Sequence, residues 1–116
     1  MAIELRVRNG QVTPELRNQV DRRLGFALGR FGDRVGRVTV SLEDLNGPRG
    51  GMDQPCRIEV GMVPSGKVKA EATDVEVAAA VNRAAERIAR RVWNEFDRRR
   101  ATRKLGSTRE LGPPEA

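Results

Sequence analysis

The stretch KVKAEATDVEVAAAVNRAAERIARRV, residues 67–92, decides the fold because its apolar residues change their spacing partway along. In its first seven residues apolar and polar side chains alternate, which places every second side chain on one face and indicates a half-buried strand. In the remainder the apolar residues recur every three or four positions, which is typical of an amphipathic helix. The sequence thus predicts a strand over residues 67–73 that leads into a helix. The apolar stripe of this helix consists of Val77, Val81, Ala84, Ile88, Val92 and Phe96.

The two ends of this helix are marked by polar sequences. Thr73 and Asp74 are suited to cap its first turn, and Thr73 with Glu76 has the spacing of a capping box. Toward the end of the chain the sequence becomes polar and rich in helix breakers, so we expect residues 101–116 to form a disordered polar tail. The length of 116 residues suits one domain, and residues 1–100 are predicted to form it.

The same alternation of apolar and polar residues predicts three further strands, over residues 3–8, 37–44 and 56–63. Between the first two, residues 14–31 have apolar side chains at helical spacing. A Thr-Pro pair is typical of a helix start, and Gly32 provides a stop at the other end. The inward-facing residues of these elements and of the strand at 67–73 are predicted to be Ile3, Leu5, Val7, Leu16, Val20, Leu24, Ala27, Leu28, Phe31, Val38, Val40, Leu42, Cys56, Ile58, Val60, Met62, Val68, Ala70 and Ala72.

Two connections complete the order β-α-β-β-β-α. Residues 45–55 read as a long Gly/Pro-rich loop, and the Pro-Ser-Gly at 64–66 reads as a tight hairpin turn. Three consecutive strands with such links favour antiparallel pairing, and the helical crossover lets the first strand pair beside them. The sequence therefore predicts an α+β fold, a two-layer sandwich in which two helices cover one face of a four-stranded sheet.

The charge of the chain favours an anionic partner. The formal net charge is +6, and all but three of the 22 basic residues are arginine. Arginine makes bidentate contacts with phosphate and stacks on bases, which lysine does not match, so this composition favours nucleic acid as the partner. The alternative is that the arginines only keep a small domain soluble. Their positions on the predicted helices decide between the two.

The composition also argues against catalysis. The chain has no His and no Tyr, and its single cysteine, Cys56, has no His to activate it. The acidic pairs Glu43–Asp44 and Glu71–Asp74 lie at predicted strand ends and a helix start, where acidic residues usually have structural roles. We therefore expect no enzyme, no catalytic residue, no metal site, no cofactor and no small-molecule substrate.

The sequence also indicates where the protein resides. No run approaches the roughly 20 apolar residues of a membrane-spanning helix, and the alternating N-terminal residues are unlike a secretion signal. A single cysteine allows no intramolecular disulfide. We expect a cytoplasmic protein with no membrane partner that is monomeric when free.

The arginines of the second helix are not spread around it. At about 100° per residue they fall on one arc roughly 100° wide, next to the apolar stripe. Like charges four residues apart repel by a few tenths of a kcal/mol, and a solvated face usually mixes signs. The first helix has a shorter basic flank that includes Phe26, which either stacks on a ligand or packs under a loop or against the second helix. Together the flanks predict one RNA-binding surface, with the candidate residues Arg22, Arg23, Arg30, Arg83, Arg87, Arg90, Arg91 and Arg98.

Two stretches of the chain resemble the ribosome hibernation promoting factors, a family of ribosome-associated inhibitors, in their short form. The first is VRNGQVTPELRNQVDRRLGFALGRFGDRVGRVTVSLE, residues 7–43, with the Thr-Pro-x-Leu-Arg sequence at its helix start. The second is the stretch at residues 67–92 quoted above, in which a strand leads into a basic helix. The resemblance extends over residues 1 to about 100.

The resemblance implies binding to the small ribosomal subunit, in the channel where messenger RNA and transfer RNA would sit. It also implies that basic helix faces contact ribosomal RNA, and that translation stops while the ribosome is preserved. Carried over by position, Arg87, Arg90 and Arg91 correspond to RNA-contacting residues of the family's second helix. Arg23 and Arg30 correspond to its basic first helix.

Two alternative functions fit the residues. One is a module outside the ribosome that binds double-stranded RNA or another nucleic acid, because basic helices on a small sheet suit more than one target. The other is a protein-interaction domain that uses the open face of the sheet. The mixed charges predicted for that face favour it less.

Overall fold

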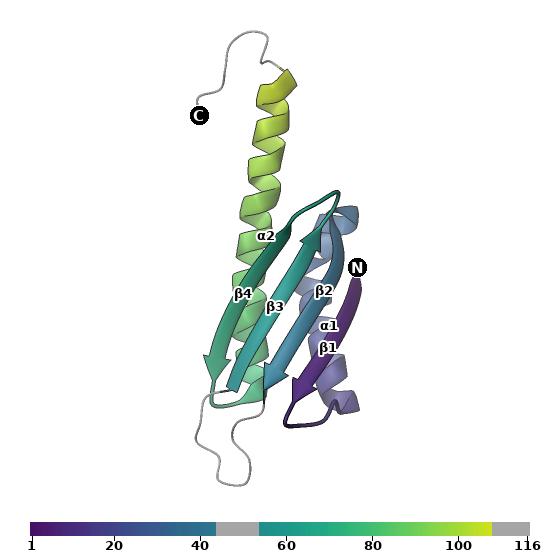
Figure 1. The fold of residues 1–116 in the computed structure, drawn as a ribbon, viewed down its shortest axis with the longest axis vertical. Coiled ribbons are helices and arrows are strands. Elements are labelled where there is room, and N and C mark those ends of the chain that lie inside the picture. Colours follow the sequence, from purple (N-terminus) through teal and green to yellow (C-terminus); the bar gives the residue numbers. More distant parts are fainter. Residues whose placement is uncertain (44–53, 108–116) are drawn as a thin grey trace.

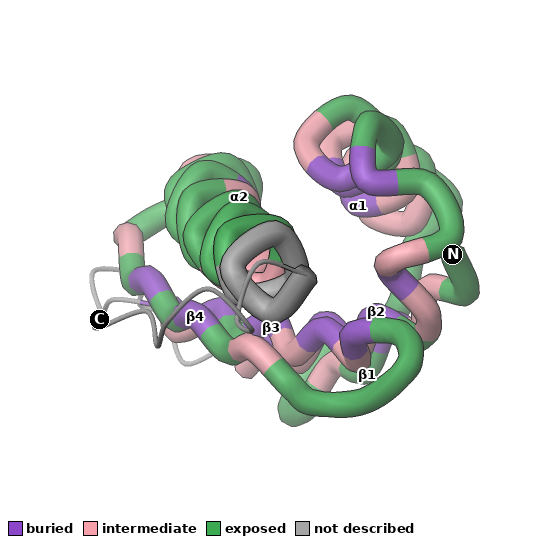
Figure 2. Tube along the Cα trace, turned by 90° about the horizontal axis from the view of Figure 1, so that it is seen from above, coloured by how far each residue is buried: buried purple, intermediate pink, exposed green. Residues whose placement is uncertain are grey.

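The computed structural model describes residues 1–43 and 54–107, with residues 102–107 described by their backbone alone. Its elements form two layers, a four-stranded sheet and a helical layer on one face of it (Figures 1 and 2). The predicted order β-α-β-β-β-α and the α+β sandwich are confirmed. The elements are β1 (Ala2–Arg8), α1 (Pro14–Leu28), the 3₁₀ helix η1 (Gly29–Arg34), β2 (Val35–Glu43), β3 (Gln54–Met62), β4 (Lys67–Asp74) and α2 (Val77–Ser107).

The strands lie in the order β1-β2-β3-β4, so β1 and β4 are the two edges of the sheet. β1 is parallel to β2, as the helical crossover between them requires, and the other two pairs are antiparallel. The register aligns Leu5, Val40, Ile58 and Ala70 in one row across all four strands. All four side chains are buried beneath the helices, so the alternation read from the sequence sets the inner face of the sheet.

The core lies between the sheet and the two helices (Figure 2). Removing a large apolar side chain from water contributes about 1.5–3 kcal/mol, and this core contains many of them. Its buried residues are Leu5, Val20, Leu24, Leu28, Phe31, Val35, Val38, Val40, Leu42, Cys56, Ile58, Val60, Met62, Ala70, Ala72, Ala80, Val81, Ala84, Ala85, Ile88 and Val92. The other predicted inward residues, Ile3, Val7, Leu16, Ala27, Val68, Val77 and Phe96, are partly buried against it.

Helix α1 begins as predicted but ends earlier. The Thr13 side chain accepts a hydrogen bond from the Leu16 amide at 3.1 Å, so Thr13 is the N-cap. The α-helix stops at Leu28 instead of Phe31, and the chain continues as η1. Glycines weaken the last turns of the predicted helix, and Gly32 has a φ of 55°, a backbone conformation that favours glycine.

The start of α2 differs from the sequence prediction. Thr73 belongs to β4 and pairs with Pro55 of β3, so the predicted capping box with Glu76 is wrong. The Asp74 carboxylate accepts from the Glu76 amide at 3.2 Å instead. The strand therefore extends one residue farther than predicted before the chain turns into the helix.

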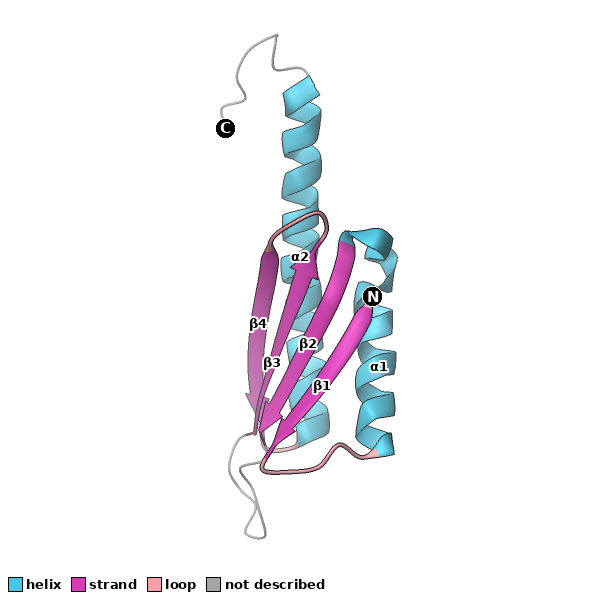
Figure 3. Ribbon diagram, turned by 45° about the vertical axis from the view of Figure 1, so that its right-hand side comes forward, coloured by secondary structure: helices cyan, strands magenta, loops and turns pink. Residues whose placement is uncertain are grey.

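Helix α2 is much longer than the sheet it covers, and it runs past the β3–β4 turn (Figures 1 and 3). It continues to Ser107, so residues 101–107, which the sequence assigned to the tail, are helical. Residues 108–116 lie outside the described residues. Of the described helices, none is both long and apolar enough to cross a membrane.

The connections around β3 agree with the sequence in part. The turn at residues 64–66 is confirmed, with Met62 donating to the Gly66 carbonyl at 2.8 Å. Gln54 and Pro55, which were assigned to the loop, are the first residues of β3. The Gln54 side chain is buried and its Nε2 donates to the Val75 carbonyl at 3.1 Å, which ties this strand to the chain before α2. The rest of the predicted loop lies outside the described residues.

Candidate nucleic-acid interface

The structure places the eight predicted arginines on the helical layer, but not in one continuous stripe. Three lie beside the edge strand β4, four line the space between α1 and α2, and one lies farther along α2. The three beside β4 are Arg83, Arg87 and Arg91. The four between the helices are Arg22, Arg23, Arg30 and Arg90, and the last is Arg98.

Arg83, Arg87 and Arg91 form a row along β4, which we call the arginine ladder. Nη1 of each donates to a backbone carbonyl of the strand: Arg83 to Thr73 at 3.0 Å, Arg87 to Glu71 at 2.7 Å and Arg91 to Lys69 at 3.0 Å. An edge strand leaves alternate carbonyls without a partner in the sheet. The ladder gives three of them a charged donor.

The ladder forms because the spacings of helix and strand match. Four residues of α-helix rise about 6 Å, and two residues of a strand advance about 6.6 Å. Each guanidinium has five N–H donors, so one bond to a carbonyl leaves others for a second partner. Arg83 also contacts the Asp74 carboxylate at 3.5 Å. Among the described residues, no carboxylate lies within 4.0 Å of Arg87 or Arg91.

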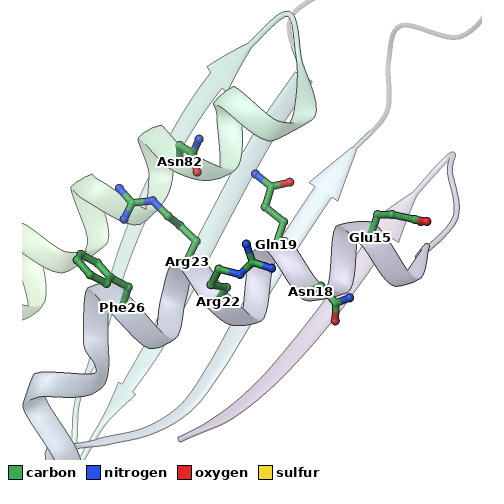
Figure 4. Close-up of a pocket in the computed structure, with 7 residues that line it drawn as sticks. All are labelled: Glu15, Asn18, Gln19, Arg22, Arg23, Phe26 and Asn82. Carbon is green, nitrogen blue, oxygen red and sulfur yellow. The ribbon is translucent and has the colours of Figure 1, made fainter.

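A second basic region lies between the helices and is hollowed into two adjoining depressions. One, of about 570 Å³, is lined by Glu15, Asn18, Gln19, Arg22, Arg23, Phe26 and Asn82 (Figure 4). The other, of about 670 Å³, is lined by Arg23, Phe26, Ala27, Arg30, Glu86, Ala89, Arg90 and Trp93. Because they share Arg23 and Phe26, we treat them as one interhelical groove. Among the described residues, its lining has four arginines and two carboxylates, which makes this lining net positive.

Three polar contacts join the helices across this groove. Gln19 Nε2 donates to the Ala78 carbonyl at 3.1 Å, and Arg23 lies 3.8 Å from the Glu86 carboxylate. The guanidinium carbon of Arg30 lies 5.5 Å from the centre of the Trp93 ring and 5.0 Å from that of Phe31. These distances suit cation–π contacts, and together the three contacts fix the two walls relative to each other.

Phe26 projects into the opening of the groove and is 82% exposed. The alternative that it packs under a loop or against α2 is therefore wrong. Trp93, on the opposite wall, is 39% exposed. The groove thus combines arginines with exposed aromatic rings.

Arg98, the eighth candidate, is bound to a carboxylate. Its Nη2 donates to Glu95 at 2.6 Å, and Nε of Arg99 donates to the other oxygen of the same carboxylate at 2.8 Å. The hydrogen bonds from Arg99 and then Arg98 lower the pKa of Glu95. Nη2 of Arg99 also donates to the Ser65 carbonyl at 2.6 Å, which holds the β3–β4 turn against α2. The sequence reading did not single out Arg99, although its i, i+4 spacing from Glu95 was visible.

Arg17 has a similar structural role at the other edge of the sheet. Its Nη2 donates to the Ile3 carbonyl of β1 at 3.0 Å, and its Nε donates to Asp21 at 3.2 Å. Arginines from both helices therefore bind backbone carbonyls of the two edge strands. The Thr-Pro-x-Leu-Arg sequence contains Arg17, but the sequence alone did not assign it this contact.

The cysteine is placed for packing. Cys56 is fully buried, and burial, followed by the charge of Glu71, raises the pKa of its thiol to about 12. The thiol therefore stays protonated at neutral pH and is a poor nucleophile. The described residues contain no group of three or more His, Cys, Asp or Glu that could hold a metal ion.

The fold and the arginines on its helical layer define a small basic α+β domain with the order β-α-β-β-β-α. Residues 3–100 match the family model described as sigma 54 modulation protein / S30EA ribosomal protein, and the chain belongs to this family. The match extends over nearly all of the predicted domain. It confirms the resemblance read from the two stretches of sequence.

Two solved structures are similar to the chain. The crystal structure of the N-terminal domain of Protein Y from Thermus thermophilus shares 29% sequence identity, with a TM-score of 0.65 over 79% of this chain and 96% of that one. A ribosomal subunit interface protein from Coxiella burnetii shares 13% identity, with a TM-score of 0.70 over 84% and 99% of the two chains, which supports the fold alone. No curated protein matches the chain in a sequence comparison.

Proposed function

We propose that the protein binds the small ribosomal subunit through ribosomal RNA and inhibits translation by occupying the channel for messenger RNA and transfer RNA. The RNA contacts come from the helical layer, chiefly from the interhelical groove and from the outward donors of the arginine ladder. The protein acts in the cytoplasm, as a monomer when free. It uses no cofactor.

The observation that carries this proposal is the charge contrast between the two faces of the molecule. On the open face of the sheet, four basic residues are paired with carboxylates: Arg6 with Glu4 at 2.9 Å, Lys67 with Glu59 at 3.2 Å, Arg37 with Glu4 at 4.0 Å and Arg57 with Glu71 at 3.9 Å. Two others on this face, Arg8 and Lys69, have no carboxylate within 4.0 Å among the described residues. Within the described part of the chain, seven arginines of the helical layer have no carboxylate within 4.0 Å: Arg22, Arg30, Arg34, Arg87, Arg90, Arg91 and Arg100.

Unpaired arginines on one face form a site for a polyanion. Phosphate contacts made by arginine release the counterions of the nucleic acid, and this release supplies much of the binding free energy. Membership of the S30EA ribosomal protein family directs the proposal to the ribosome. The names of the similar structures, Protein Y and a ribosomal subunit interface protein, agree with that choice.

Inhibition by occupancy requires no chemistry from the protein. The one cysteine is buried with a raised pKa, and the chain has no histidine to act as a proton shuttle at neutral pH. Inhibition in a cell-free translation system should therefore be stoichiometric with ribosomes and leave the ribosomal RNA intact. Cleaved or modified RNA would count against the proposal.

Co-sedimentation with purified small subunits through a sucrose gradient tests the proposal. The protein should travel with the subunit at about 50 mM salt and be released well before about 500 mM, since each phosphate contact adds to the salt dependence. Arg22→Ala with Arg90→Ala removes two unpaired charges from the groove and should weaken binding. Arg37→Ala with Arg57→Ala removes the same charge from the open face of the sheet and should leave binding unchanged.

The same gradient separates the proposal from its alternatives. A protein that binds free double-stranded RNA but stays at the top of the gradient with subunits would be a nucleic-acid module outside the ribosome. If the open-face variant loses binding and the groove variant keeps it, the partner lies on the sheet face and the proposal is wrong.

A further inference from the structure

The chain has few aromatic residues, and half of them are not used by the core. It contains three Phe, one Trp and no Tyr. Phe31 and Phe96 pack edge to face, with ring centres 5.6 Å apart, and Phe31 is buried. The other two, Phe26 and Trp93, are both exposed and line the same depression of about 670 Å³.

The two exposed rings have different supports. Trp93 is held in place, because Arg30 covers part of its ring at 5.5 Å and Phe96 lies 6.0 Å from it. Phe26 is 82% exposed, so its side chain contributes little to the stability of the fold. An aromatic side chain so open to water, across a groove from a second ring, is suited to take a flat apolar partner.

The charges around the rings identify that partner. Arg23 precedes Phe26 by three residues on α1, so it lies on the side of the helix that carries the ring. Arg30, in η1, lines the same depression as Phe26. Figure 4 shows Arg23 and Phe26 on the groove side of α1. Arg90 is on the opposite wall. Glu86 is the one carboxylate among the described residues that line this depression, and it lies 3.8 Å from Arg23.

A ligand for this site must offer both an aromatic face and negative charge. A nucleotide with an unstacked base has both: the base stacks on an aromatic ring, and the phosphates on either side accept from arginine. A base inside a duplex cannot reach the ring, since its faces are covered by its neighbours. An apolar protein segment would leave the arginines that line the depression without acceptors.

We propose that Phe26 and Trp93 form a stacking site for one unstacked base of single-stranded RNA, with Arg23, Arg30 and Arg90 holding its flanking phosphates. The inference rests on the proposed RNA-binding function and specifies the form of RNA that the groove takes. The arginine ladder contacts backbone carbonyls of β4 and no aromatic ring in these contacts. We expect it to bind RNA phosphates whatever base they carry.

Trp93 is the only tryptophan, so its fluorescence reports on the site directly. The full-length protein is titrated with hexaadenylate RNA and with an abasic hexanucleotide that has the same number of phosphates. Hexaadenylate should quench the Trp93 emission and bind about tenfold more tightly than the abasic probe. Equal affinity and equal emission with the two probes, or no binding of either, would overturn the inference.

Substitutions at Phe26 separate stacking from apolar contact. Phe26→Leu keeps an apolar side chain without an aromatic face and should lower the affinity for hexaadenylate about tenfold, to that of the abasic probe. Phe26→Tyr should retain the parent affinity. Neither substitution removes a charge, so the salt dependence of RNA binding should be the same as in the parent. Val12→Ala, at another exposed apolar residue outside the groove, should bind as the parent does. Parent affinity for Phe26→Leu would also overturn the inference.

Ribosome binding is measured separately on the same variants. If hexaadenylate quenches Trp93 in a base-dependent way but the parent does not sediment with small subunits, the stacking site stands and the proposed function fails. If the parent sediments with subunits but the two probes bind alike, the proposed function stands and the stacking site fails.

Discussion

The arginine ladder and the interhelical groove have the same residue type at similar helical spacings, yet their surroundings differ. In the ladder, each guanidinium donates to a carbonyl of β4 at 2.7–3.0 Å. In the groove, Arg30 rests on aromatic rings, Arg23 reaches Glu86 at 3.8 Å, and Arg22 and Arg90 line the depressions. An arginine stripe on a helix therefore predicts where charge lies, but not whether the guanidinium already has a structural partner.

The difference has a physical origin in the sheet. β4 is an edge strand whose outward carbonyls would otherwise be available to another chain. Fixed cations over these carbonyls satisfy them and discourage edge-to-edge pairing. The groove is lined by the two helices and not by a strand edge, so Arg22 and Arg90 have no carbonyl to bind there and remain available for a ligand. We expect the ladder to contribute to both stability and binding, and Arg22 and Arg90 of the groove to contribute to binding alone.

The largest effect is expected at the core position that supports both regions. Ile88 is fully buried under α2, between the ladder and groove sides of the helix. Ile88→Asp places an unpaired charge in the core and should destabilise the domain by about 4 kcal/mol or more. Circular dichroism should show loss of the cooperative thermal transition. A variant that melts as the parent does would mean that α2 does not pack on the sheet as described.

The next effect is expected in the groove. Arg22→Glu with Arg90→Glu exchanges two attractive charges for two repulsive ones and should weaken small-subunit binding about a hundredfold. It should also flatten the salt slope by about two. The melting temperature should stay within about 2 °C of the parent, because these side chains have no carboxylate or carbonyl partner among the described residues. A large drop in the melting temperature would contradict their assignment as free binding residues.

The matched reversal in the ladder should behave differently. Arg87→Glu with Arg91→Glu changes the net charge by the same amount, but it also removes the donors to the Glu71 and Lys69 carbonyls. The fold should survive with about 1–2 kcal/mol less stability, and binding should also weaken. Hydrogen exchange measured by mass spectrometry should be faster in β4 than in the parent. If stability is unchanged, the ladder contacts have no structural effect.

The smallest effect is expected at Arg99, which lies on neither surface. Arg99→Ala removes the hydrogen bonds to Ser65 and Glu95 and should lower stability by about 1 kcal/mol, or a few degrees in melting temperature. Ribosome binding should be unchanged. Weakened binding at unchanged stability would place RNA contacts beyond the groove, along the extended part of α2.

Much of the fold could be predicted because alternation and helical spacing report burial directly. The stretch at residues 67–92 indicated both β4 and α2, and the row Leu5, Val40, Ile58 and Ala70 consists of predicted inward residues. Element ends were less accurate. Gln54 and Pro55 follow a Gly/Pro-rich stretch, which concealed that they pair in β3. The sequence ATRKLGS at 101–107 has helix formers but no apolar stripe, so the spacing that marked the rest of α2 gave no signal for its last residues.

The division of the arginines between the ladder and the groove could not be predicted from these spacings. It depends on which strand lies beside each flank of α2, and this is set by the strand order and by the rotation of the helix on the sheet. The contact of Arg99 with the β3–β4 turn depends on the same arrangement. The sequence left two interpretations of Phe26, stacking on a ligand or packing against the protein. The exposure that decides between them depends on how the two helices pack.

The most direct test of this division is arginine modification by a dicarbonyl reagent, with the rate at each site measured by mass spectrometry. In the free protein, Arg22 and Arg90 should react quickly, and Arg87 and Arg91 should react slowly because each donates to a carbonyl. Bound to the small subunit, Arg22 and Arg90 should become protected. Equal rates at all four sites in the free protein, or undiminished reaction of Arg22 and Arg90 on the subunit, would contradict the account.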